Sequence, residues 1–213
     1  MEHEPYGLYE KYVKRPLDCF LSSIAIIALS PLIFMIAVLV RKKLGSPVIF
    51  VQERPGRNEK IFKLYKFRTM TDAKDDNGNL LPDTARLTPF GKALRMTSLD
   101  ELPELLNIIK GDMAIIGPRP LLVRYLSAYT EKEKHRHDVR PGLSGLAQIN
   151  GRNFTKWDQR LALDIQYVQN ITFSGDVKIL LKTILNVIRR DNVAVNTEEV
   201  ESFLDEERGT TIT

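Results

Sequence analysis

The most apolar part of the chain is the stretch from Cys19 to Val40, which contains no charged residue. A straight helix of these twenty-two residues would be about 33 Å long at about 1.5 Å per residue, enough to cross a hydrocarbon core. The stretch is too long for a typical removable signal peptide, and it lacks the small-residue cleavage site. The pattern therefore predicts a membrane helix rather than a buried helix of a soluble domain.

Two features of this segment favour a helix that enters and leaves the membrane by the same face. Ser30-Pro31 lies near its middle, where proline removes a helical hydrogen bond and bends the helix. Both flanks are basic, so a spanning helix would place one basic cluster on the wrong side. We predict a re-entrant hairpin over residues 11–43, broken at Ser30 and Pro31, with a kinked span as the alternative. The basic flanking residues are Lys11, Lys14, Arg15, Arg41, Lys42 and Lys43.

The rest of the chain alternates short apolar runs with turns, which predicts one domain over residues 44–190 and a C-terminal tail over 191–213. We therefore expect an α-rich α/β fold, made mostly of helices with a small β element. Extended segments are predicted over 48–51 and 61–70, turns over 54–58 and 140–145, and helices from Thr88, over 121–136, over 157–170 and over 176–190.

The predicted helix over 176–190 is strongly amphipathic, with apolar residues on one face and lysine and arginine on the other. Such a helix either packs on its own core or lies in the membrane interface, and the sequence leaves both interpretations open. The apolar face consists of Val177, Leu180, Leu181, Ile184, Leu185 and Ile188.

Composition restricts the classes of function. The chain has 31 basic and 27 acidic residues, which gives a net charge of +4. This small excess suits an anionic membrane surface or a phosphate-bearing substrate better than a nucleic-acid duplex. The single cysteine, Cys19, excludes an intramolecular disulfide and a cysteine zinc site, and it agrees with a reducing, cytoplasmic location.

The first chemical candidate is the pair of adjacent carboxylates Asp100 and Glu101. Ser98 with Glu101 matches a capping box, and apolar residues follow at helical spacing until Gly111 ends the pattern. A carboxylate at a helix start, favoured there by the helix dipole, can bind a divalent cation or attack an electrophile. An ordinary first helical turn is the alternative interpretation of the pair.

Three arginines in turns rich in proline and glycine form the second candidate. Arg119 lies between two prolines, Arg140 precedes Pro141, and Arg152 lies between a glycine and an asparagine. Guanidinium forks match phosphate oxygens, and a rigid turn leaves them little freedom to lose on binding. A diphosphate substrate needs such positive groups, together with magnesium, in phosphoryl transfer.

An ordered set of motifs resembles the bacterial sugar transferases known as small monotopic phosphoglycosyl transferases. The resemblance covers about residues 11–190. Within it, the run from Lys134 to Gly142 looks most like the PglC-type members that begin bacterial N-glycan assembly. The motifs are Lys66-Phe67-Arg68-Thr69-Met70, Asp100-Glu101-Leu102-Pro103-Glu104-Leu105, Gly111-Asp112-Met113, Gly117-Pro118-Arg119-Pro120, and Arg140-Pro141-Gly142 through Gly151-Arg152-Asn153.

The resemblance implies a reaction that initiates membrane glycoconjugate assembly. A UDP-sugar would give its sugar phosphate to polyprenyl (undecaprenyl) phosphate and release UMP, through a covalent phosphosugar on Asp100. Asp100 would be the nucleophile and lie next to Mg²⁺, while Glu101 would act as a base, a metal partner or an electrostatic aid. The residues implied to bind the substrate or order its pocket are Lys66, Arg95, Pro118, Arg119, Arg152 and Asp164.

The implied location is the cytoplasmic face of a bacterial inner membrane, with a monotopic anchor, interfacial amphipathic helices and a cytoplasmic catalytic domain. Membrane lipids and downstream glycosyltransferases are then the expected partners, and nucleic acid is not. Two other functions stay open, a membrane-anchored scaffold that binds anionic lipid and a magnesium-dependent hydrolase of lipid pyrophosphates. A membrane-tethered nucleic-acid binder ranks last, because aromatic residues are not interleaved with the arginines.

Overall fold

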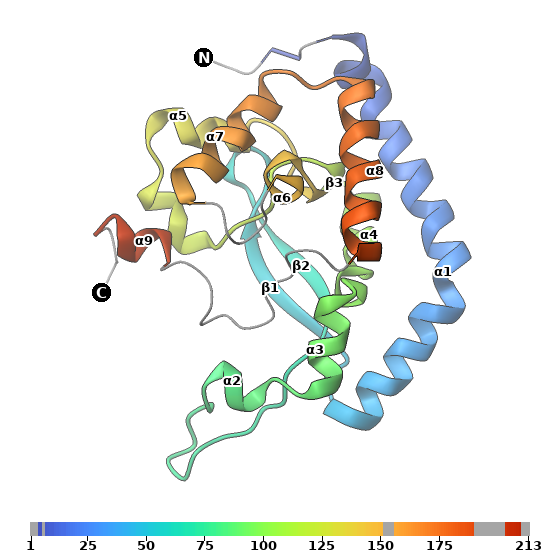
Figure 1. Cartoon of the computed structure of the whole chain (residues 1–213), viewed down its shortest axis with the longest axis vertical. Coiled ribbons are helices and arrows are strands. Elements are labelled where there is room, and N and C mark those ends of the chain that lie inside the picture. The colour runs from blue at the N-terminus through green and yellow to red at the C-terminus, as the bar shows by residue number, and fades with distance from the viewer. Residues whose placement is uncertain (1–3, 6, 151–155, 190–202, 210–213) are drawn as a thin grey trace.

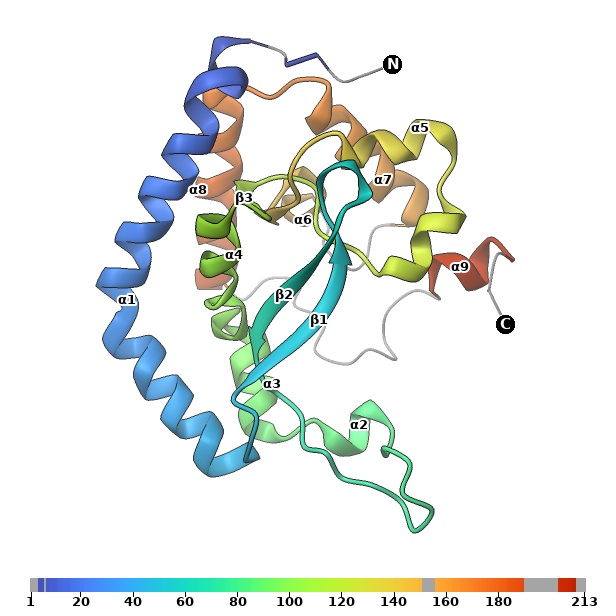
Figure 2. The ribbon, with the colours of Figure 1, turned by 180° about the vertical axis from the view of Figure 1, so that it is seen from behind.

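The computed structural model describes residues 4–5, 7–150, 156–189 and 203–209. The long apolar segment forms one bent helix, α1 (Lys14–Leu44), which follows the π-helical stretch η1 (Tyr9–Val13) and curves along one side of the domain (Figures 1 and 2). Within the described residues, Tyr9–Leu44 is the one helix long and apolar enough to cross a membrane. The predicted break is a bend within a continuous helix, and the re-entrant path stays a prediction.

The continuity of α1 at the proline has a local cause. Pro31 has no N–H to donate to the carbonyl of Ile27, four residues earlier. The hydroxyl of Ser30 donates to that carbonyl instead, at 2.8 Å. Because the freed acceptor is satisfied by a side chain, the helix bends without being interrupted.

The two faces of α1 have different surroundings. Ile36 and Val40 are buried against the domain, whereas Phe20, Ile27 and Phe34 are 63%, 74% and 73% exposed. A row of large exposed apolar side chains on a helix of this length fits a membrane anchor.

Two of the basic residues before the apolar segment connect α1 to the domain. Lys14 Nζ lies 2.6 Å from Asp176 Oδ2, and the Arg15 guanidinium donates to the carbonyls of Ile108 and Ile109. These side chains therefore hold the N-terminal end of α1 on the domain.

The β element consists of two small sheets. Strand β1 (Ile49–Pro55) pairs antiparallel with β2 (Ile61–Phe67), around the turn η2 (Arg57–Glu59). Strand β3 (Ala114–Ile116) pairs in parallel with β4 (Gly142–Ser144). The small β element is thus confirmed, but the turns predicted over 54–58 and 140–145 each include strand residues.

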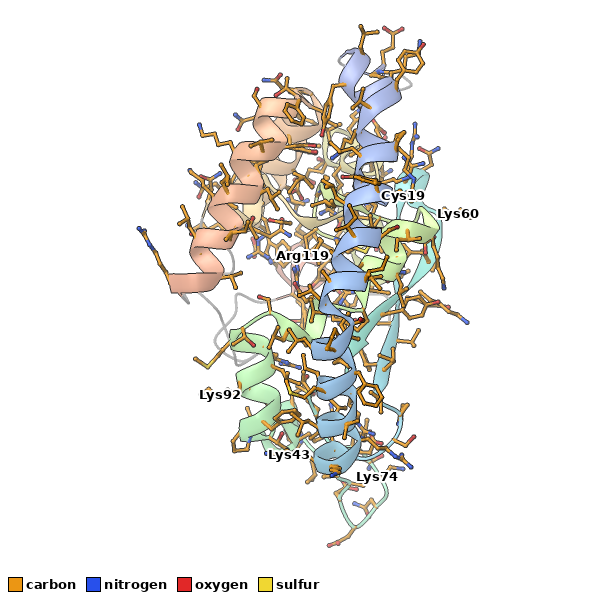
Figure 3. The ribbon with its side chains drawn as sticks, turned by 90° about the vertical axis from the view of Figure 1, so that its right-hand side faces the viewer. Cys19, Lys43, Lys60, Lys74, Lys92 and Arg119 are labelled. Atoms are coloured by element: carbon orange, nitrogen blue, oxygen red, sulfur yellow. The ribbon has the colours of Figure 1, made fainter. Side chains whose placement is uncertain are left out.

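Helices surround these sheets, and α7 and α8 confirm the helices predicted near 157–170 and 176–190 (Figure 1). Helix α8 lies on the same side of the molecule as α1 (Figure 3), with Ile179 buried but Leu181 and Leu185 about half exposed. The helices are α2 (Asp83–Arg86), α3 (Pro89–Met96), η3 (Leu99–Glu101), α4 (Glu104–Lys110), η4 (Val123–Ala128), α5 (Glu131–Lys134), η5 (His135–His137), α6 (Leu146–Ile149), α7 (Trp157–Val168), α8 (Phe173–Arg189) and α9 (Leu204–Glu207).

The single helix predicted over 121–136 is wrong. The chain forms three short pieces there, η4, α5 and η5. Thr130 has an extended backbone and begins α5 with a capping box, in which its side chain accepts from Glu133 N–H and the Glu133 carboxylate accepts from Thr130 N–H. A cap of this kind starts a new helix and so divides the apolar pattern.

Candidate functional site

The site forms where the turn η3 leads into α4. Asp100 and Glu101 lie in η3, and Glu104 is the first residue of α4. The predicted capping box is wrong, because Ser98 is left-handed (φ 54°) and its carbonyl, not its hydroxyl, accepts from Glu101 N–H. The resulting 3₁₀ turn delays the α-helix to Glu104. Gly111 ends α4 with φ 97°, as the sequence predicts.

Helix α4 is fixed to strand β2 by a buried amide. Asn107 is fully buried, and its Nδ2 donates to the Lys63 carbonyl at 2.7 Å while its Oδ1 accepts from Tyr65 N–H at 3.1 Å. These two hydrogen bonds set the position of β2 against α4. They therefore place Lys66, the next residue of β2, beside η3. Asn107 is not among the residues predicted from the sequence, although a polar residue among core-facing helix positions is a readable signal.

Three carboxylates and two cations meet at this point. Glu101 Oε1 accepts from Lys66 Nζ and from Arg119 Nη2, each at 2.8 Å. Lys66 Nζ also lies 3.1 Å from Glu104 Oε1, and Glu104 is only 3% exposed. Asp100 is 8% exposed, and its carboxylate makes no hydrogen bond or ion pair with any residue that the structure describes.

These surroundings separate the acidities of the two adjacent carboxyl groups. Burial raises the pKa of Asp100 to about 6, and the charge of Glu101 adds to this effect. Burial also acts to raise the pKa of Glu101, but Lys66 and Arg119 outweigh it and hold that pKa below its usual range. Glu101 is therefore the ionised partner of the cations, whereas Asp100 is the carboxylate left available for chemistry.

Arg119 is held by its backbone in the turn between β3 and η4. The Pro118 carbonyl accepts from Gly142 N–H at 2.9 Å, and the Arg119 carbonyl accepts from Arg136 Nη2 at 2.7 Å. The turn packs so closely on β4 that a Cβ at Gly142 would lie 2.1 Å from Gly117 N. Pro118 thus contributes through its carbonyl, and the Arg119 side chain is free to reach Glu101.

Asp164 lies beneath this turn instead of on the surface of the site. It is 2% exposed and pairs with Arg136, whose Nη2 lies 2.8 Å from Asp164 Oδ2. Arg136 is itself 2% exposed, so both members of the pair are buried. The buried pair supports the turn that carries Arg119, because Arg136 Nη2 also donates to the Arg119 carbonyl at 2.7 Å.

The remaining predicted residues lie in different places. Arg95 in α3 donates from Nε to Thr69 Oγ1 at 3.1 Å, and its charge and that of Asp100 influence each other. Arg140 donates from Nε to the Gly111 carbonyl at 2.9 Å and so caps the end of α4 away from Glu101. Arg152 falls outside the described residues.

A magnesium ion would find few protein ligands here. Within the described part of the chain, no group of three or more His, Cys, Asp or Glu side chains is arranged to hold a metal ion. Mg²⁺, however, is commonly bound by one or two carboxylates together with substrate phosphates and water. The Asp100 carboxylate makes no hydrogen bond or ion pair among the described residues, and it fits that ligand set once a diphosphate is bound.

The chain is similar to known proteins over most of its length. The family model described as bacterial sugar transferase matches residues 9–190. The sugar transferase EpsL of Bacillus subtilis is 49% identical over 181 residues, covering 85% of this chain and 90% of that protein.

Two further relatives carry more specific names. The undecaprenyl-phosphate galactose phosphotransferase of Salmonella typhimurium is 36% identical over 198 residues, covering 85% of this chain and 41% of that protein. The UDP-glucose:undecaprenyl-phosphate glucose-1-phosphate transferase of Klebsiella pneumoniae is 38% identical over 181 residues, covering 80% of this chain and 39% of that protein. The match therefore spans less than half the length of these two relatives. Membership of this chain in the PglC-type subgroup stays a prediction.

Proposed function

The chain belongs to the bacterial sugar transferase family, and we propose that it transfers a sugar phosphate from a UDP-sugar to polyprenyl phosphate and releases UMP. The names of the Salmonella and Klebsiella relatives support undecaprenyl phosphate as the acceptor and a sugar 1-phosphate as the group transferred. The observation that carries the proposal is the buried carboxylate of Asp100 beside the Lys66–Glu101–Arg119 cluster, with no hydrogen bond or ion pair to any residue in the described ranges.

The proposed reaction proceeds in two displacements at phosphorus. An Asp100 carboxylate oxygen attacks the β-phosphorus of the UDP-sugar, the bond to the bridging oxygen breaks, and UMP leaves with that electron pair. An oxygen of polyprenyl phosphate then attacks the aspartyl phosphosugar. The bond between phosphorus and Asp100 breaks, which restores the carboxylate and leaves the sugar on a polyprenyl diphosphate.

The neighbouring residues supply positioning and charge. Lys66 and Arg119 hold positive charge beside the carboxylate that receives the phosphoryl group, where it offsets the charge of the transition state. Magnesium, when bound with the substrate diphosphate, would supply further charge neutralisation. Because both cations bind one oxygen of Glu101, we assign Glu101 to holding them in place and not to proton abstraction.

The acceptor is a membrane lipid, so the site must lie at a membrane surface. The exposed apolar face of α1 supports this placement, because its side chains can enter the bilayer while the opposite face stays on the domain. In the view of Figure 3, Arg119 lies between α1 and α8. We propose a monotopic arrangement on the cytoplasmic face of the inner membrane, where downstream glycosyltransferases would receive the product.

The proposal is tested by trapping the intermediate. Detergent-solubilised protein is incubated with Mg²⁺ and a panel of UDP-sugars without lipid, and peptides are measured by mass spectrometry. We expect UMP release and a sugar-phosphate adduct on the peptide that contains Asp100. Full turnover with polyprenyl phosphate but no adduct would point to direct transfer. Phosphate release from a polyprenyl diphosphate, without sugar transfer, would support the hydrolase instead.

The pH dependence of adduct formation gives a second prediction. The rate is expected to rise with pH through about 6, because Asp100 attacks only when ionised and its pKa is raised to about 6. Burial also raises the pKa of Glu104, to about 7, so Glu104→Gln is the control. The variant should keep the acid limb of the wild-type profile. A rate independent of pH between about 5 and 8 would exclude Asp100 as the titrating nucleophile.

A further inference from the structure

The segment Phe203–Gly209 packs on the domain although it lies beyond the matched residues 9–190. It falls within the C-terminal tail predicted over 191–213. It contains α9, which lies across the domain from α1, beside the region of η4 and α5 (Figures 1 and 2). We refer to Phe203–Gly209 as the C-terminal clamp.

One apolar side chain anchors the clamp. Leu204 is fully buried, and a leucine removed from water in this way stabilises the docked position through the hydrophobic effect. Leu204 belongs to a buried apolar cluster whose other members come from the chain that follows Arg119 and from α7. They are Leu121, Tyr125, Ala128, Tyr129, Trp157 and Leu161.

Charged contacts surround this apolar anchor. Arg208 donates to the Ala128 carbonyl at 2.9 Å, to both carboxylate oxygens of Glu133 at 2.6 and 2.9 Å, and to Asp158 at 2.8 Å. A bidentate arginine–carboxylate pair fixes orientation as well as distance. The clamp therefore holds η4, α5 and α7 together.

A second pair of contacts involves Arg124 of η4. Its Nε lies 3.4 Å from Asp205 Oδ2, and its guanidinium carbon lies 3.9 Å from the centre of the Phe203 ring. Arg124 thus contacts two residues of the clamp, through an ion pair with Asp205 and a cation–π contact with Phe203.

The clamp holds residues 119–136, a segment whose two ends meet at Arg119; we call it the 119–136 loop. The chain runs away from the site after Pro120. It comes back to the site at Arg136, whose Nη2 donates to the Arg119 carbonyl at 2.7 Å. The clamp contacts this loop at Arg124, Ala128 and Glu133, between its two ends. A displacement of the loop would therefore move Arg119 and its contact with Glu101.

We propose that the C-terminal clamp is a positioning element that holds the 119–136 loop so that Arg119 meets Glu101 at the reacting centre. The expected effect of the clamp on sugar-phosphate transfer rests on the proposed transferase function. Misplacement of a charge-stabilising group by about 1 Å can reduce turnover about 100-fold, so a remote clamp of this kind has a measurable effect.

The test compares full-length Leu204→Asp with Leu204→Met. We expect Leu204→Asp to lower kcat/KM for sugar-phosphate transfer at least about tenfold and to speed amide hydrogen exchange across residues 119–136. Leu204→Met keeps the apolar volume and should stay near wild type. Glu207→Gln, a change at an exposed position of the same segment, is the matched control. If Leu204→Asp fails to fold, Arg208→Met serves in its place.

A double-mutant cycle separates positioning from general destabilisation. Once Arg119→Ala has removed the group being positioned, the clamp variant should cost little further activity, whereas a merely structural defect would add its full effect. Faster exchange in 119–136 with unchanged kcat/KM, or additive losses with Arg119→Ala, would overturn the proposal. If the wild-type protein shows no sugar-phosphate transfer, the proposed function fails, and hydrogen exchange still decides whether the clamp holds the loop.

Discussion

Replacing Asp100 with asparagine is expected to reduce sugar-phosphate transfer about 10⁴-fold and to abolish the covalent adduct. The amide nearly matches the carboxylate in shape but cannot form the bond to phosphorus. Asp100 is buried and makes no hydrogen bond within the described residues, so the change removes no structural contact. UMP release and lipid-linked sugar are the quantities to measure.

The control for this variant is the same chemical change at an exposed position. Asp76 lies in the exposed loop 75–79, and Asp76→Asn should leave transfer unchanged. Transfer close to wild type in Asp100→Asn, or an equal loss in Asp76→Asn, would contradict the assignment of Asp100 as nucleophile.

Asp100→Asn should also increase stability at alkaline pH. Because burial raises the pKa of Asp100 to about 6, the folded state binds this proton more tightly than the unfolded state. Wild-type stability is therefore highest below the unfolded pKa near 4 and declines as pH rises through about 6. Asparagine removes this penalty, so we expect a gain on the order of 1 kcal/mol at about pH 8 and none near pH 4, measured by denaturant unfolding.

The parts of the fold that the sequence predicted correctly depend on local patterns. Helices α3, α7 and α8 follow from apolar spacing, and Thr88 caps α3 by accepting from Gly91 N–H, a signal contained within four residues. The family match over residues 9–190 confirms the resemblance that the ordered motifs predicted.

The errors arise where a local pattern competes with distant contacts. Residues 121–136 have helical spacing, but Leu121 and Tyr125 serve a cluster completed by Trp157 and Leu204, and Arg136 turns inward to Asp164. Pairing across 28 residues is not visible in a hydrophobic pattern. The capping box at Thr130 was readable, and it marks where the helix is divided.

The sequence singles out Asp100 and Glu101 as a pair, but it does not divide the roles between them. Adjacent carboxylates identify Asp100 and Glu101, yet their acidities differ because Lys66, 35 residues away, and Arg119, 18 residues away, both bind Glu101. The same folding buries Glu104 next to Lys66, which the sequence analysis did not single out. Assigning roles within the pair therefore required the three-dimensional arrangement.

Lys66→Met is expected to lower kcat/KM for transfer about 100- to 1000-fold and to destabilise the protein by on the order of 3 kcal/mol. Lys66 Nζ lies 2.8 Å from Glu101 Oε1 and 3.1 Å from Glu104 Oε1. Without the ammonium group, these carboxylates lose their shared cation in a buried position, and the phosphoryl group loses a neighbouring positive charge. Steady-state kinetics and denaturant unfolding measure the two effects.

The pH profile of Lys66→Met distinguishes an electrostatic role from a purely structural one. The charge of Lys66 lowers the pKa of Asp100, so its removal should raise that pKa further. The acid limb of adduct formation is then expected to move from about pH 6 to a higher pH, and part of the lost activity should return at alkaline pH. A loss that is uniform over pH would mean that Lys66 does not act on the nucleophile through its charge.

A second substitution tests the origin of the instability. Glu104→Gln removes one of the two carboxylates that Lys66 neutralises, so Lys66→Met/Glu104→Gln should recover much of the stability lost in Lys66→Met. Activity should stay low in the double variant, because the positive charge beside Asp100 is still missing. Lys63→Met, on the exposed face of the same strand, is the matched control and should change neither quantity. Recovery of full activity by Glu104→Gln would contradict a catalytic contribution of Lys66.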